Sequence, residues 1–180
     1  HDLLRCELFP HGHALVCIDR IYDIIANIFR LSIIKAVSLQ QNSNKQDKME
    51  TRKEIAAEKK RCGSHNCTQA VVCTYYNYTG IDEDTLKNVG NAFAAGMGNM
   101  EGTCGALVGA GVVLGLATKD KAKAIKAMRQ IMTQFQQRNG ATQCRLLKGV
   151  GTGKVLRECP LCVADAAEFL EEQLDKLTDQ

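Results

Sequence analysis

The sequence contains few aromatic residues and almost no proline. Among its 180 residues there is no tryptophan, and there are five phenylalanines, four tyrosines and two prolines. Because 45% of the residues are nevertheless hydrophobic, the core must consist of aliphatic and alanine side chains, which favours closely packed helices over a sheet. So little proline also argues against a series of short strands joined by turns. The sequence therefore predicts an all-α protein, a bundle of about five helices with an extra N-terminal amphipathic helix.

The net charge is small, and it is unevenly distributed. Residues 1–61 carry 11 Lys and Arg against 8 Asp and Glu, whereas residues 62–180 carry 12 of each. A neutral main domain lacks the basic surface that nucleic-acid binding requires. The apolar stretch 18–37 contains five charged residues, which is too many for a transmembrane helix. We therefore expect no nucleic-acid partner and no membrane span.

Nine cysteines are present, which is below the density of a small disulfide-bonded scaffold. An odd number also fits poorly with a fully paired framework, and the first residues do not form a legible signal peptide. We therefore expect a cytoplasmic location, where thiols stay reduced unless they are transiently catalytic. In that compartment the cysteines would be metal ligands, redox thiols or inert core residues.

The chain is expected to divide near residue 48. Residues 1–48 form a predicted N-terminal extension, in which Ile21, Ile24, Ile25 and Ile28 have the spacing of an amphipathic helix. The polar residues 42–48 then read as a linker, and residues 49–180 form the predicted helical, cysteine-containing domain. An alternative is that Met49 is the natural start of the protein.

Apolar periodicity, capping residues and stop signals predict the helices of the main domain. They cover residues 67–78, 82–96, 104–116 and 120–138, a short turn at 144–148, and a last helix from residue 159. Asp82 is the predicted N-cap of the second, and Gly140 ends the fourth. Small residues in the third helix would let a neighbouring backbone approach closely, although an interior glycine costs about 1 kcal/mol relative to alanine; they are Gly105, Gly109, Ala110, Gly111 and Gly115.

Cysteines recur once per predicted segment, at Cys67, Cys104, Cys144 and Cys159. Cys104 opens the string Cys-Gly-Ala-Leu-Val-Gly, and Cys159 opens Cys-Pro-Leu-Cys, which ends at Cys162. The spacing does not fit the short-range zinc signatures. Because the four cysteines lie on separate segments, any site that they share is built by folding rather than by one local loop.

This pattern resembles the family of redox-active proteins labelled C_GCAxxG_C_C, over roughly residues 62–178. The family pattern is a cysteine, a Cys-Gly-Ala-x-x-Gly box and two further cysteines. The resemblance implies that Cys67, Cys104, Cys144 and Cys159 are the catalytic or metal-binding residues, and that residues 49–180 are a redox domain. Cys162 joins them as a candidate cofactor ligand, because the Cys-x-x-Cys spacing is common to thiol exchange sites and to metal-ligand pairs.

Two forms of a redox centre agree with these residues: a dithiol/disulfide pair, or thiolate ligands of an iron–sulfur cluster. The same four cysteines could instead hold a structural zinc ion. The rival hypothesis is a helical binding module with inert cysteines, which would use its glycine-lined helix in a homodimer or docking surface. Whether the protein is an enzyme stays open, and its redox partner is unknown.

The reactivity of the thiols can also be predicted from their positions. Cys159, placed at the N-cap by Pro160 and close to Arg157, is expected to be the most reactive thiol, and Cys104 the second. Cys162 is the expected resolving partner or second ligand. His65 is a candidate fifth ligand, although a lone histidine near a helix start is more often a cap or a surface residue.

Overall fold

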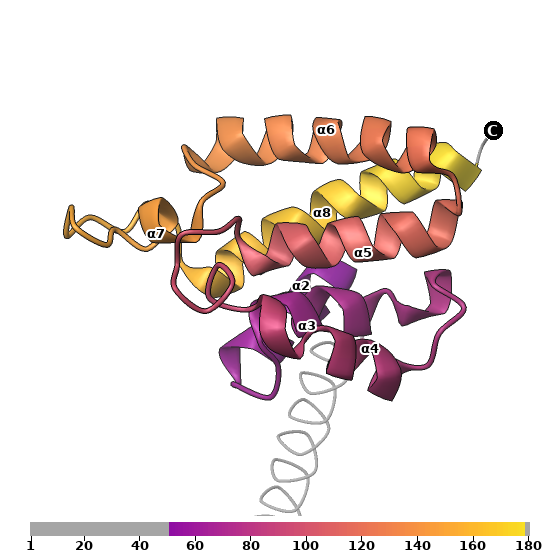
Figure 1. Cartoon of the computed structure of the whole chain (residues 1–180), viewed down its shortest axis with the longest axis horizontal. Helices are drawn as coiled ribbons and strands as arrows, with labels where there is room; N and C mark the ends of the chain where they lie inside the picture. Colours follow the sequence, from indigo (N-terminus) through magenta and orange to yellow (C-terminus); the bar gives the residue numbers. More distant parts are fainter. Residues whose placement is uncertain (1–50, 179–180) are drawn as a thin grey trace, which may run out of the picture. The chain divides into compact units, whose positions relative to one another are not determined.

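The computed structural model of the chain describes residues 51–178, which belong to one compact unit. This part contains seven α-helices, two short 3-10 helices and no strand (Figure 1). The α-helices are α2 (Arg52–Arg61), α3 (Cys67–Thr74), α4 (Glu83–Val89), α5 (Gly105–Thr118), α6 (Lys121–Asn139), α7 (Cys144–Leu147) and α8 (Cys159–Thr178). The prediction of an all-α bundle is confirmed, while the predicted N-terminal amphipathic helix lies outside the described residues. No helix in this part has both the length and the apolar character needed to cross a membrane.

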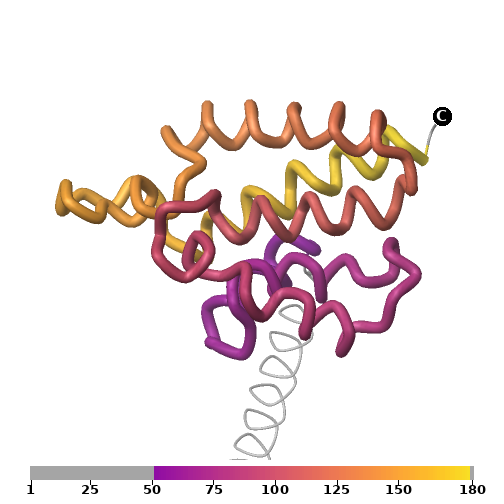
Figure 2. The backbone as a smooth tube through the Cα atoms, in the orientation of Figure 1, coloured from indigo at the N-terminus to yellow at the C-terminus, as the bar shows by residue number. Residues whose placement is uncertain are grey.

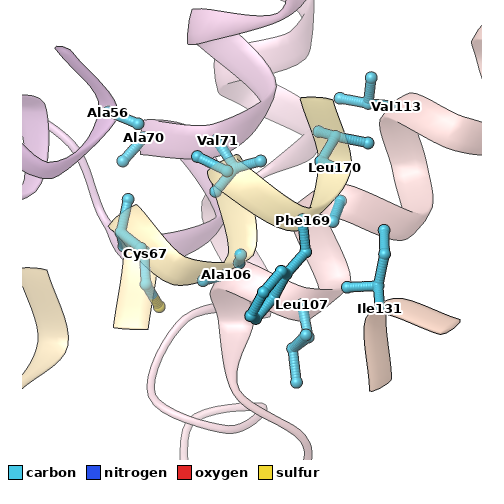
Figure 3. Close-up of a cluster of buried hydrophobic side chains, with 14 of the residues drawn as sticks. Ala56, Cys67, Ala70, Val71, Ala106, Leu107, Val113, Ile131, Phe169 and Leu170 are labelled. Atoms are coloured by element: carbon cyan, nitrogen blue, oxygen red, sulfur yellow. The ribbon is translucent and has the colours of Figure 1, made fainter. Parts of the chain in front are cut away.

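Two helices, α5 and α8, form the centre of the bundle. Helix α5 packs against α3, α6 and α8, and α8 also contacts α2 and α6. As Figure 3 shows, the core between them is made of small and aliphatic side chains with few aromatic ones, as the composition predicts. The largest side chains with no exposed surface are Tyr75, Phe135, Leu86, Leu107, Leu114, Ile131 and Leu170.

Most helix ends follow the predicted signals. The carboxylate of Asp82 accepts a hydrogen bond from the Thr85 amide at 2.8 Å, and Gly140 ends α6 in the left-handed conformation. Helix α4, predicted to reach residue 96, ends instead at Val89. At this end the side chain of Gln69 donates to the Lys87 carbonyl at 2.9 Å, which satisfies one of the carbonyls that have no partner within the helix.

Helices α3 and α5 approach each other at the backbone, because α5 presents glycines to α3. A Cβ atom at Gly109 would lie 2.9 Å from the Thr68 carbonyl oxygen, and one at Gly105 would overlap the sulfur of Cys67. The hydroxyl of Thr68 donates to the Gly105 carbonyl at 2.8 Å, which satisfies a buried polar group at the contact. The predicted close approach is therefore present at Gly105 and Gly109. At Gly115 it is absent, because the space around that position is open.

This contact predicts opposite effects for two alanine substitutions in the same helix. Gly105→Ala should destabilise the protein by about 1–3 kcal/mol, because the new methyl group overlaps backbone and sulfur atoms. Gly115→Ala should be neutral or should stabilise by up to about 1 kcal/mol, through helix propensity alone. Denaturant unfolding of both variants measures the difference. Equal stability of the two would contradict the close approach of α3 to α5.

The division of the chain near residue 48 stays a prediction, and truncation tests it. A protein that starts at Met49 should keep a helical circular-dichroism spectrum and one cooperative thermal transition, because α2 to α8 bury a continuous core among themselves. Loss of folding on truncation would mean that residues 1–48 contribute to that core.

Candidate functional site

Five cysteines lie at or near the starts of four helices. Cys67 is the first residue of α3, Cys104 is the N-cap of α5, and Cys144 is the first residue of α7. Cys159 begins α8, and Cys162 lies one turn further into it. Four of them are buried, whereas Cys159 is partly exposed. We refer to these five residues as the five-cysteine site.

Backbone hydrogen bonds tie Cys104 to Cys144 across nearly forty residues of chain. The amide of Cys104 donates to the Thr142 carbonyl at 2.8 Å, and the amide of Cys144 donates to the Gly102 carbonyl at 3.0 Å. A single antiparallel bridge between residues 103 and 143 accompanies these bonds. The loop before α5 and the segment that opens α7 therefore lie side by side at one end of the bundle (Figure 2).

The loop of residues 94–104 has an unusual backbone that serves two cysteines. Ala95, Met97 and Met100 have φ angles of 50°, 66° and 66°, and a left-handed conformation costs a non-glycine residue about 1–3 kcal/mol. In this conformation the amide of Ala95 hydrogen-bonds the sulfur of Cys67. Gly96 packs so closely on Cys144 that a Cβ atom there would lie 2.7 Å from the Cys144 Cβ.

Cys104 and Cys162 interact as a pair of thiols, and the Cys162 thiol also donates to the Arg157 carbonyl at 3.7 Å. The side chain of Cys162 lowers the pKa of Cys104 to about 7, helped by the amides of Ala106 and Leu107 in the first turn of α5 and by the charge of Lys148. The same interaction, together with burial, raises the pKa of Cys162. Within this pair the thiolate is therefore favoured at Cys104 and the protonated thiol at Cys162.

Cys67 and Cys144 lie close enough to Cys104 for its charge to change their pKa values. Burial raises the pKa of Cys67 and of Cys144, and in each case the charge of Cys104 adds to the increase. Lys148 is the cation of the site, because its pKa is raised mainly by the charge of Cys159 and further by that of Cys144. The structure therefore brings all five cysteines together, with one lysine beside them.

Lys148 is the residue that sequence reasoning missed. It follows Cys144 by four residues, one helical turn, and that spacing places the two side chains on one face. Arg157, which the sequence suggested as the cation beside Cys159, instead binds the buried carboxylate of Asp165 through two hydrogen bonds of 2.9 and 3.0 Å. Helix α8 begins at Cys159, where the sequence predicts its start. The thiol therefore lies in the first turn, where the helix dipole still acts on it.

The sulfur atoms are not arranged as a preassembled site for a single metal ion. Among residues 51–178, the group of three or more ligand-type side chains with all donor atoms within 4.8 Å of one another is His65, Cys73 and Glu83. A tetrahedral zinc ion with bonds of about 2.3 Å needs its sulfurs about 4 Å apart. An iron–sulfur cluster holds its thiolates further apart, because several metal ions lie between them. Neither His65 nor Cys73 belongs to the five-cysteine site.

The arrangement agrees with the comparison of the sequence with known protein families. The family model described as "putative redox-active protein (C_GCAxxG_C_C)" matches residues 65–173, a range that contains all five cysteines and Lys148. No curated protein and no solved structure matches the chain. The chain belongs to the C_GCAxxG_C_C family of redox-active proteins.

Proposed function

We propose that the five-cysteine site is a dithiol/disulfide redox centre in which Cys104 and Cys162 are the reacting pair. The observation that carries this proposal is the interaction of the two side chains, which lowers the pKa of Cys104 to about 7. A thiolate is the nucleophile of thiol–disulfide exchange, and a thiol with a pKa near the ambient pH is the most effective one. The thiol of Cys162, already in contact with this thiolate, is placed to complete the disulfide.

The reaction is a two-electron exchange with the disulfide of an acceptor. Oxidation forms a bond between the sulfurs of Cys104 and Cys162 and releases their protons, while the acceptor disulfide takes up two electrons and leaves as two thiols. Cys159 is the partly exposed member of the site and has Lys148 beside it. We infer that Cys159 attacks the acceptor disulfide first and releases one acceptor thiol. Cys104 then attacks the Cys159 sulfur of the mixed disulfide and releases the second acceptor thiol. Cys162 finally attacks the Cys104 sulfur, which forms the Cys104–Cys162 disulfide and returns Cys159 as a thiol. A cytoplasmic location, which would keep the pair reduced between turnovers, remains part of this proposal.

The surface at this end of the bundle supports a protein as the acceptor. The 94–104 loop, α7, the 148–158 connector and the start of α8 carry large apolar side chains whose exposed fractions are 40–58%. Apolar groups concentrated at one end of a molecule are typical of protein contact surfaces. These residues are Met97, Leu146, Val150, Val155, Leu156 and Leu161.

A second candidate is an iron–sulfur cluster, and one observation favours it. More than two thiols converge, and both an amide and an ammonium group are directed at their sulfurs, as in sites that stabilise the negative charge of a cluster. Cys67, Cys104, Cys144 and Cys159 would hold the cluster, with Cys162 hydrogen-bonded to one of the ligands. When bound, the cluster would supply one-electron transfer. Helix packing and the 94–104 loop would orient the ligands and exclude water.

A redox titration tests the proposed function. The full chain, equilibrated without metal in buffers of defined thiol/disulfide ratio, should show a two-electron transition that Cys104→Ser and Cys162→Ser abolish. Cys62→Ser is the control, because Cys62 is exposed and lies outside the five-cysteine site, and it should leave the transition unchanged. If all three variants titrate alike, the proposed pair is wrong. A coloured protein after purification without oxygen, with the colour lost in Cys67→Ser and Cys144→Ser, would favour the cluster instead.

The pKa of Cys104 should depend on the hydrogen bond from Cys162. Cys162→Ala removes the donor and should raise the pKa, so that the thiolate forms only at higher pH. Cys162→Ser keeps a hydroxyl donor and should retain most of the lowering. The ultraviolet absorbance of the thiolate, compared with that of Cys104→Ser at each pH, reports this titration. In the unmodified protein the difference should have its midpoint near pH 7. A midpoint that stays the same in Cys162→Ala would refute the claim that Cys162 lowers the pKa of Cys104.

A further inference from the structure

A second group of metal-ligating side chains lies outside the five-cysteine site. His65 follows α2, Cys73 is near the end of α3, and Glu83 is the first residue of α4. One donor atom from each residue, a ring nitrogen, a sulfur and a carboxylate oxygen, lies within 4.8 Å of the other two. The three residues come from separate segments, so an ion held between them would join three parts of the fold.

Each of the three ligands is held in place by contacts of its own. The amide of His65 donates to the Lys59 carbonyl at the end of α2, at 3.3 Å. The thiol of Cys73, which is buried, lies 3.8 Å from the Glu83 carbonyl oxygen and donates to it. Glu83 is fixed by the start of α4, where Asp82 caps the helix. A site whose ligands are ordered before the ion arrives loses less conformational entropy on binding.

The imidazole of His65 has a partner for one of its two nitrogens. Its Nδ1 lies 2.8 Å from the hydroxyl oxygen of Ser64. A hydrogen bond from Nδ1–H to this oxygen selects the tautomer with a free lone pair on Nε2, which is how histidine ligands of metals are commonly oriented. The hydroxyl of Ser64 in turn donates to the Lys59 carbonyl at 3.1 Å, so the orientation of the ring is tied to the end of α2.

The site is accessible from solvent. A surface hollow of about 340 Å³ is lined by Lys59, Cys73 and Glu83 among other residues. His65 does not line this hollow but is itself partly exposed, as is Glu83, whereas Cys73 is buried. An ion therefore approaches the three ligands past Glu83, where the hollow has room for a water molecule as a fourth ligand. Three protein ligands with one open position are typical of zinc sites that exchange their fourth ligand, whereas structural zinc sites are closed.

From these observations we propose that His65, Cys73 and Glu83 bind one zinc(II) ion, with water at the fourth position. A borderline-soft cation suits a donor set of one thiolate, one imidazole and one carboxylate. Binding replaces the proton of the Cys73 thiol, which passes to solvent, and breaks its hydrogen bond to the Glu83 carbonyl. The site is independent of the proposed redox function, because none of its ligands belongs to the five-cysteine site.

Lys59 competes with the ion for Glu83. Its ammonium lies 2.7 Å from the Glu83 carboxylate and 3.3 Å from the Cys73 carbonyl. Zinc must displace this ion pair and is repelled by the ammonium charge, so the affinity depends on how readily Lys59 moves away. The ion pair is only partly buried, with 24% of the Lys59 side chain and 43% of the Glu83 side chain exposed, and solvent screening weakens such pairs. If zinc binds at this site, removal of the Lys59 ammonium should therefore raise the affinity for zinc.

The test is zinc binding to the reduced full chain, measured by competition with a chromophoric chelator. His65→Ala, Cys73→Ser and Glu83→Gln should each weaken the binding of one zinc ion by about tenfold or more, since each removes a direct ligand. Asp84→Asn is the matched control for Glu83→Gln, because it neutralises the adjacent, exposed carboxylate of the same helix. It should change the affinity by less than about threefold, the effect of an exposed charge. Lys59→Met should tighten binding by about tenfold, because it removes a competing cation.

Two outcomes would overturn the proposal. One is an absence of zinc binding by the reduced full chain. The other is zinc that binds equally well to the unmodified protein, to His65→Ala and to Glu83→Gln, and that is lost in Cys104→Ser, which would place it at the five-cysteine site. Circular dichroism of each variant checks that its helices are intact. Because His65 and Glu83 are not buried, their variants keep the test valid even if Cys73→Ser fails to fold.

Discussion

The close approach of α3 to α5 is the contact on which the arrangement of the sulfur atoms depends. Glycines at positions 105 and 109 let the two helices meet at their backbones, and the sulfur of Cys67 occupies the space where a side chain at Gly105 would lie. The same helix start carries Cys104, so this contact places the first two family cysteines side by side. The 94–104 loop connects the pair to Cys144, and α8 brings Cys159 and Cys162 to the same end.

Electrostatics then decides which of the buried thiols carries charge. Burial disfavours a thiolate, and a second negative charge close to the first disfavours it further. Burial also penalises the thiolate of Cys104, but the Cys162 side chain and the first-turn amides of α5 outweigh this penalty, whereas for Cys67 and Cys144 burial prevails. One anion among several thiols is the arrangement needed for exchange, since the anion attacks and a neighbouring thiol resolves. The charge of Lys148, outside the core, balances that anion.

Most helix boundaries could be predicted from the sequence, because helix caps and apolar periodicity are local signals. Asp82, Asp120 and Gly140 bound their helices as expected, and the glycines of α5 indicated that another backbone approaches this helix closely, without indicating that α3 is the partner. The pairing of Cys104 with Cys162 could not be predicted, because it depends on packing between segments 58 residues apart. The glycines at 96, 98 and 102 indicated a loop before Cys104, but its backbone path could not be predicted, since Ala95, Met97 and Met100 adopt left-handed conformations that their residue types disfavour. The prediction that Arg157 is the cation beside Cys159 was wrong, because Arg157 pairs with Asp165, whose burial could not be recognised from the sequence.

The central claim is that folding makes Cys104 and Cys162 partners despite their distance in the sequence. Identification of the disulfide that forms when the reduced, metal-free full chain is oxidised by a limiting amount of a small disulfide tests it most directly. Peptide mapping under non-reducing conditions should find Cys104 joined to Cys162 as the main product. A main product that joins Cys159 to Cys162 would show that the local Cys-x-x-Cys motif, rather than the pair assembled by folding, is the redox centre. That result would contradict the account.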